Sequence, residues 1–180
     1  APGSAAIHAA AWRAKWGRWF VVRSYLQVFL LQGLFLLVIS YSVILINTSV
    51  SGSPHPLGFL DLAGTVVWVV GFLFEAVGDA QLSRFRRDPG SRGKIMNTGL
   101  WRYTRHPNYF GESLMWWGIF LLALSLPYGW TAVVSPFLIT FLLVRVSGVP
   151  MLEKKYAGNA EFHAYARRTS VFVPWPPKKL

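Results

Sequence analysis

The sequence contains no cysteine and few charged residues, and both absences narrow the classes of protein to consider. Without cysteine among its 180 residues, the chain has no disulfide scaffold, thiolate metal ligand, iron–sulfur cluster or cysteine nucleophile. Only 14% of the residues are charged, whereas about 25% is usual for soluble domains. Aromatic residues make up 16% of the chain, which excludes a disordered segment. The composition therefore indicates a membrane protein.

Two long stretches, residues 24–60 and 113–144, contain no Asp, Glu, Lys or Arg. A helix that crosses the hydrocarbon core of a bilayer, about 30 Å thick, needs ~20 predominantly apolar residues. We predict an all-α fold, a polytopic helical membrane protein that forms one membrane domain over residues 1–180. Four segments approach the required length, and we expect transmembrane helices over residues 25–46, 59–82, 107–126 and 130–147.

The positive charges gather at one side of this predicted arrangement. Apart from Arg145, the Lys and Arg residues fall within 13–23, 84–105 and 154–179, which four crossings place on the same side, whereas the opposite loops carry no charge. That is the positive-inside pattern of a protein in a cytoplasmic (inner) membrane. We therefore expect a cytoplasmic cofactor loop at 83–106 and a cytoplasmic lid of amphipathic helices at 150–180. The net charge of +11 then needs no nucleic-acid partner.

Ionisable side chains at membrane depth are costly, and two of them stand near the end of the second predicted helix. Glu75 and Asp79 are four residues apart and share a helix face, which Arg86 joins if the helix continues. Two interpretations stay open. The face is either an interfacial helix end with a carboxylate–arginine pair, or one wall of a polar pocket open to the cytoplasm.

A dense group of polar side chains precedes the third predicted helix. It comprises Arg102, Tyr103, Arg105, His106, Asn108, Tyr109 and Glu112. Arginines near the level of the lipid headgroups can bind lipid phosphates. That interpretation leaves unexplained why Asn108 and Glu112 lie one turn apart on the same face of the helix. Arginine forks bind phosphates, and amide and carboxylate groups bind ribose hydroxyls or a carboxamide. The pattern favours a site for an anionic, nucleotide-like ligand.

Several other chemistries have no support in the sequence. His8, His55, His106 and His163 are scattered, so we expect no metal site. No glycine-rich dinucleotide fingerprint, phosphate-binding loop or nucleophile elbow is present. No Gly-x-x-x-Gly pattern marks a dimer interface, so the oligomeric state stays open.

The segments 74–79, 97–112, 165–170 and 173–175 resemble the steroid 5-alpha-reductase superfamily, in particular its bacterial DUF1295 branch. The likeness is to the C-terminal two-thirds of such proteins. It implies a membrane reductase that takes hydride from NADPH and reduces an activated C=C bond (an enone) in a lipophilic, steroid- or isoprenoid-like substrate. It also implies that the helices carrying the substrate-activating Glu and Tyr precede this chain. The catalytic acid is therefore unassigned, with Tyr109 and Glu112 as candidates.

Carried over residue by residue, the resemblance implies a set of cofactor-binding side chains on the predicted loop, the helices beside it and the lid. They are Glu75, Asp79, Arg84, Arg86, Arg87, Arg102, Tyr103, Arg105, His106, Asn108, Tyr109, Glu112, Arg167 and Arg168. Steroid reductases have an asparagine near the place of Glu75, so this chain departs from the pattern of the family at that contact.

Two alternatives remain. The string 105–111 is also similar to isoprenylcysteine carboxyl methyltransferases, which bind S-adenosylmethionine, but only Glu153 stands where those proteins have paired glutamates. Methyl transfer also needs no clamp for a 2′-phosphate, which the basic residues at 84–94 suit. The other alternative is a non-catalytic membrane protein that binds lipid headgroups. The expected partners are the bilayer and a lipophilic small molecule.

Overall fold

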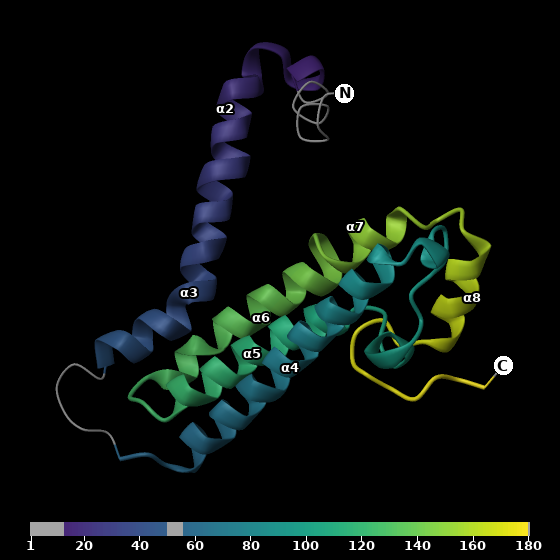
Figure 1. The fold of residues 1–180 in the computed structure, drawn as a ribbon. Coiled ribbons are helices and arrows are strands. Elements are labelled where there is room, and N and C mark those ends of the chain that lie inside the picture. Colours follow the sequence, from purple (N-terminus) through teal and green to yellow (C-terminus); the bar gives the residue numbers. More distant parts are fainter. Residues whose placement is uncertain (1–12, 50–55, 180) are drawn as a thin grey trace. The chain divides into compact units, whose positions relative to one another are not determined.

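The computed structural model describes residues 13–49 and 56–179, and it divides the chain into two compact units. The boundary lies between Val38 and Ile39, inside a helix. The candidate functional site lies in the second unit, which ends with the C-terminus in Figure 1.

The described part of the first unit is a run of helical segments that follow one another without a break. They are the 3-10 helix η1 (Gly17–Trp19), α2 (Phe20–Ser24), the π-helix η2 (Tyr25–Leu30) and the start of α3 (Leu31–Ser49). No charged side chain follows Arg23 in this run, and most of its apolar side chains are exposed. An apolar exposed surface of this kind suits contact with lipid.

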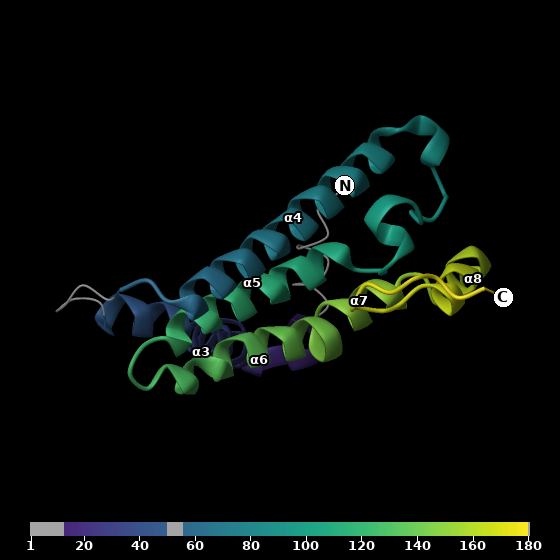
Figure 2. The same ribbon diagram turned by 90° about the horizontal axis from the view of Figure 1, so that it is seen from below.

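In the second unit three long helical segments lie side by side, with α5 between α4 and α6 in both views (Figures 1 and 2). Their bounds are α4 (Phe59–Arg87), α5 (Pro107–Leu124) and the continuous run η6 (Gly129–Val133), α6 (Val134–Phe141) and η7 (Leu142–Val146). Shorter elements follow α4 and η7: η4 (Pro89–Ser91), η5 (Gly99–Arg102), α7 (Val149–Lys154) and α8 (Ala160–Arg168). α4 extends five residues beyond the predicted boundary at 82.

Among the described residues, three helical stretches are long and apolar enough to cross a membrane: Arg13–Ser49, Phe59–Arg87 and Gly129–Lys154. The prediction of a helical membrane protein is therefore confirmed, and the described residues contain no strand beyond one isolated bridge. α5 is not among the three, since its first turns carry the polar residues Asn108 and Glu112. The fourth crossing stays a prediction.

Glycines bring α4 and α5 into backbone contact. Gly64, Gly71 and Gly78 recur every seven residues on α4 and are buried. On α5, a Cβ atom at Gly111 would stand 2.5 Å from the Gly71 oxygen, and one at Gly118 would stand 2.7 Å from the Gly64 oxygen. Seven residues are two helical turns, so the glycines form one antiparallel seam. Small residues allow helices to approach this closely where no hydrophobic effect drives them together.

Hydroxyl groups join the other helices of the second unit. The Ser42 hydroxyl donates to the Ala132 carbonyl oxygen at 3.1 Å, and Ser135 Oγ accepts from the Ser42 backbone N–H at 3.1 Å. Between α5 and α6, Ser113 and Thr140 share a hydrogen bond of 2.6 Å. These contacts satisfy polar groups that have no water to bind at membrane depth. None of the residues in these contacts lines the cavity of the candidate site.

Candidate functional site

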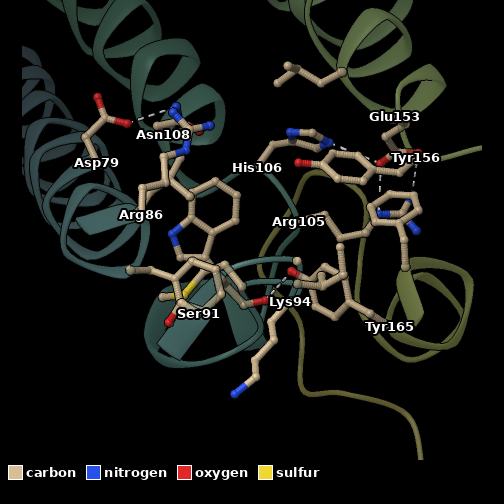
Figure 3. A pocket seen from close by; sticks show the side chains of 18 of the residues that line it. Asp79, Arg86, Ser91, Lys94, Arg105, His106, Asn108, Glu153, Tyr156 and Tyr165 are labelled. Carbon is tan, nitrogen blue, oxygen red and sulfur yellow. Dashed lines mark hydrogen bonds and ion pairs between the residues drawn. The ribbon is translucent and has the colours of Figure 1, made fainter. Parts of the chain in front are cut away.

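A cavity of about 530 Å³ opens where the end of α4 meets the start of α5, the loop after α4, and helices α7 and α8. This volume lies within the range of about 300–1,000 Å³ typical of small-molecule sites. Its lining combines cations, carboxylates, an imidazole, an amide and several aromatic rings. Figure 3 shows how these side chains come together from the different elements.

Asp79 and Asn108 form one end of the cavity (Figure 3). The Asn108 Nδ2 group donates to Asp79 Oδ1 at 3.0 Å. Asp79 lies one residue after Gly78, whose missing side chain lets Pro107 and Asn108 approach α4. The glycine seam therefore sets the distance between the carboxylate and the amide.

Positive side chains line the part of the cavity formed by the end of α4 and the loop after it. They are Arg86, Arg92 and Lys94, all exposed. The loop turns at Asp88, whose carboxylate accepts from the Gly90 N–H at 3.0 Å and the Ser91 hydroxyl at 2.8 Å. These two hydrogen bonds, the Ser91 bond first, lower the pKa of Asp88 below its ordinary value. The Asp88 carboxylate therefore stays ionised and holds the turn, and Arg92 and Lys94 after it line the cavity.

Glu153, from α7, holds two side chains of the segment before α5 (Figure 3). Arg105 Nε lies 2.9 Å from Glu153 Oε1, and its Nη2 donates to Oε2 at 3.3 Å. His106 Nε2 lies 3.1 Å from the same Oε1. Arg105 also donates from Nη1 to the carbonyl oxygen of Ala166 at 3.0 Å. One carboxylate therefore joins this segment to α7, and the arginine extends the connection to α8.

Both basic side chains of this cluster are buried, with 9% of Arg105 and 5% of His106 exposed. Burial lowers the pKa of the His106 imidazole below its ordinary value of 6.5. The hydrogen bond and charge of Glu153 act in the opposite direction, and the Arg105 charge lowers the pKa further. At neutral pH the buried histidine is therefore uncharged.

The segment that carries Arg105 and His106 is fixed to α4 and α8 by Trp101. The buried indole Nε1 of Trp101 donates to the Gly78 carbonyl oxygen at 3.1 Å. The Tyr165 hydroxyl, on α8, donates to the Trp101 carbonyl oxygen. Burial raises the pKa of Tyr165 well above its ordinary value, so the hydroxyl keeps its proton for this bond. Nearby, the Leu100 N–H donates to Gln81 Oε1 at 3.0 Å.

The C-terminal tail runs beside the same segment. Thr104 pairs with Ser170 in an isolated parallel bridge, in which the Arg105 N–H donates to the Ser170 oxygen at 2.9 Å. The Thr104 hydroxyl donates to the Phe172 oxygen at 2.7 Å, and the Trp175 N–H donates to the Tyr103 oxygen at 3.0 Å. α8 begins after Asn159, whose side chain caps it by accepting from the Phe162 N–H at 2.9 Å.

The structure brings six of the fourteen predicted cofactor-binding residues to this cavity. They are Asp79, Arg86, Arg105, His106, Asn108 and Tyr109. The other eight do not line it: Glu75, Arg84, Arg87, Arg102, Tyr103, Glu112, Arg167 and Arg168. Of these, Arg87 shares a second hollow with Asp79 and Arg86, and Arg167 lines a shallow groove on α8. The candidate acid Tyr109 is in the cavity, whereas Glu112 lies one turn farther along α5.

Sequence reasoning missed the role of Glu153 and of the aromatic wall formed by Tyr156, Phe162 and Tyr165. Glu153 stands 48 residues from Arg105, so no local spacing connects the two. The aromatic residues recur near helical spacing at the predicted lid, which was the one signal for them. The rings of Tyr156 and Phe162 are stacked with centroids 5.0 Å apart. Within residues 13–49 and 56–179, no three His, Asp or Glu side chains are grouped to hold a metal ion.

The fold and the cavity together define a helical integral membrane protein with a polar, mixed-charge pocket at one end of a helical hairpin. A family model described as "Protein of unknown function (DUF1295)" matches residues 8–169. The chain belongs to this family.

Curated relatives connect the chain to enzymes that act on steroids and sterols. It is 37% identical over 115 residues to 3-oxo-5-alpha-steroid 4-dehydrogenase 1 of Bos taurus and 30% identical to that of Rattus norvegicus. Each match covers 63% of this chain and 41% of the relative. A match to Delta(14)-sterol reductase LBR of Gallus gallus has 28% identity and covers 49% of this chain and 16% of the relative. The chain thus spans less than half the length of these proteins. No solved structure matches it.

Proposed function

We propose that this chain forms the cofactor-binding part of a membrane reductase, one that uses NADPH to reduce an activated C=C bond in a lipophilic, steroid- or isoprenoid-like substrate. The observation that carries the proposal is the cavity itself, which joins a group of cations to a carboxylate–amide pair. The likeness to 3-oxo-5-alpha-steroid 4-dehydrogenase 1 supports the reaction and the class of substrate.

The lining fits the chemistry of a phosphorylated dinucleotide. Arg86, Arg92 and Lys94 offer flexible cations for the phosphates, including the 2′-phosphate that distinguishes NADPH from NADH. Asp79 and Asn108 offer an acceptor and a donor for ribose hydroxyls or the carboxamide. When bound, NADPH supplies the hydride that is added to the double bond.

The protein's own residues would then bind and orient the cofactor and supply a proton. Arg105 is largely engaged by Glu153 and Ala166, so we assign it to shaping the cavity wall more than to gripping phosphate. Tyr109 is favoured over Glu112 as a proton source near the cofactor, because only Tyr109 lines the cavity. In the proposed topology the cavity opens to the cytoplasm, where NADPH is available.

The test is a calorimetric titration that measures the binding of NADPH, NADH and S-adenosylmethionine, each in turn, to the detergent-solubilised protein. Arg86→Ala should weaken NADPH binding by roughly tenfold, as expected for a lost charge-assisted contact. Arg84→Ala is the matched control, because Arg84 is an exposed arginine at the same helix end but outside the cavity.

We expect the Arg84 variant to bind NADPH within about twofold of the unmodified protein, and the Arg86 variant to lose its preference for NADPH over NADH. Equal losses in both variants would contradict the proposed phosphate contact. Selective binding of S-adenosylmethionine would replace the reductase with a methyltransferase. Binding of none of the three would favour a protein that binds only lipid headgroups.

A further inference from the structure

The buried histidine of the cavity suggests a more specific role. We propose that Glu153 fixes His106 in the tautomer with its proton on Nε2, so that Nδ1 accepts a hydrogen bond from an amide N–H or a hydroxyl of the bound ligand. Glu153 is then a positioning residue and His106 a ligand-binding residue. The inference rests on the proposed function for the identity of that ligand.

The position of the proton follows from the chemistry of the cluster. A carboxylate oxygen accepts hydrogen bonds, and Glu153 Oε1 already faces Arg105 Nε, which can only donate, at 2.9 Å. The contact of 3.1 Å between Oε1 and His106 Nε2 therefore requires the hydrogen on Nε2. A neutral imidazole carries one N–H, so Nδ1 is left with a lone pair.

Two charged neighbours and burial decide the charge of the imidazole. Arg105 opposes a second positive charge, Glu153 favours one, and burial of the ring favours the neutral form most strongly. The Tyr109 ring is stacked on the imidazole with centroids 5.5 Å apart and planes 7° from parallel. The stacking sets the plane of the ring, and the 3.1 Å contact of Nε2 with Glu153 sets its rotation, so Nδ1 points in one fixed direction.

Nδ1 is a buried acceptor with no hydrogen-bond partner among the described residues. Buried polar atoms without a partner are rare, and each one calls for an explanation. His106 is 95% buried and belongs to the cavity lining, and Figure 3 shows its second nitrogen on the side of the ring away from Glu153. A ligand donor group would complete it.

The same lone pair excludes one part of the proposed ligand from this position. A phosphate has only acceptor oxygens at neutral pH and would be repelled by Nδ1. The group beside His106 is therefore a neutral donor such as the carboxamide of a nicotinamide or a hydroxyl of ribose. The phosphates are left to the cations Arg86, Arg92 and Lys94.

The first test needs no ligand. Nitrogen-15 NMR of histidine-labelled protein at pH 7 should show His106 with a protonated Nε2 and an unprotonated Nδ1, the resonances being assigned by their loss in His106→Asn. Glu153→Ala should abolish this fixed pattern, whereas Lys154→Ala, the exposed neighbour on α7, should leave it intact. An imidazolium, or a proton on Nδ1, in the unmodified protein would overturn the proposal.

The second test separates the two ring nitrogens in NADPH binding. Asparagine places a polar atom near the position of Nδ1, whereas glutamine places one near Nε2 and can keep the contact with Glu153. We expect His106→Gln to lose about three- to tenfold in NADPH affinity, the worth of one neutral hydrogen bond, and His106→Asn to lose less. The reverse order would mean that His106 serves only to hold Glu153.

A ligand-dependent measurement on the unmodified protein guards against variants that fold poorly. Saturation with NADPH should shift the Nδ1 resonance and leave Nε2 nearly unchanged. An unchanged Nδ1 resonance in saturated protein would refute the ligand contact. If NADPH does not bind at all, the proposed function fails together with the ligand contact, whereas the spectrum without ligand still decides the tautomer separately.

Discussion

The glycine seam leads to a prediction that can be worked out from distances. A Cβ atom introduced by Gly111→Ala would stand 2.5 Å from both the Glu75 nitrogen and the Gly71 oxygen. Ordinary contacts begin near 3.4 Å, so α4 and α5 must separate locally by about 0.9 Å. The clashing atoms belong to backbone, so no side chain can rotate to relieve them.

The cost follows from the packing that this separation removes. A gap of about 0.5–1 Å forfeits roughly a quarter to a half of the dispersion energy of each facing pair of atoms. Overpacked sites typically lose about 1–3 kcal/mol, and we expect the upper end of that range here. The separation also pulls Asn108 from Asp79, whose 3.0 Å hydrogen bond joins the same two helices. Ligand binding should therefore weaken together with stability.

The assay is unfolding of the detergent-solubilised protein, with Gly33→Ala as the matched control. Gly33 lies in α3, and a Cβ atom there meets nothing within 4 Å. The control should gain up to about 1 kcal/mol in the free energy of unfolding, from the higher helix propensity of alanine. Equal stability of the two variants would refute the backbone contact between α4 and α5.

The cluster around Glu153 gives two further predictions. Arg105→Ala should lower the free energy of unfolding by about 2 kcal/mol, because it leaves Glu153 and the Ala166 oxygen without their charged donor. Arg102 is exposed, and Arg102→Ala should change the free energy of unfolding by less than about 0.5 kcal/mol in the same assay. Because the folded pKa of His106 lies below 6.5, the unfolded chain binds the proton first as the pH falls. Stability should therefore be greatest above pH 6.5 and decrease between 6.5 and the folded pKa, and His106→Asn should flatten this decrease. A steep decrease that persists in the variant would assign it to another group.

Local patterns were sufficient to predict the helical membrane fold and part of the site. Charge-free stretches indicate apolar helices because a charged group costs free energy in lipid. Asp79 lies near the end of a predicted helix, and Asn108 directly follows the proline that begins the next one. Their mutual contact was not readable, because it depends on how closely the two helices approach.

The remaining parts depend on contacts between distant residues. In the sequence, Glu153 marks only a departure from the methyltransferase pattern, yet it holds Arg105 and His106 across more than forty residues of chain. The seven-residue spacing of the glycines on α4 is visible in the sequence, but it does not match the Gly-x-x-x-Gly pattern that marks close helix pairs. Arg84 and Arg86 cannot be separated by composition. Only the direction of the helix face places Arg86 at the cavity.

The cavity lining has a consequence for how this family can diversify. Every residue that lines it lies between Asp79 and Tyr165, within the second unit. Substitutions before Phe59 leave those side chains and the glycines of the seam unchanged. A lineage can therefore keep the composition of this pocket constant while the helical segments at 13–49 change in sequence, so the family can vary its lipid-facing surface without altering the pocket.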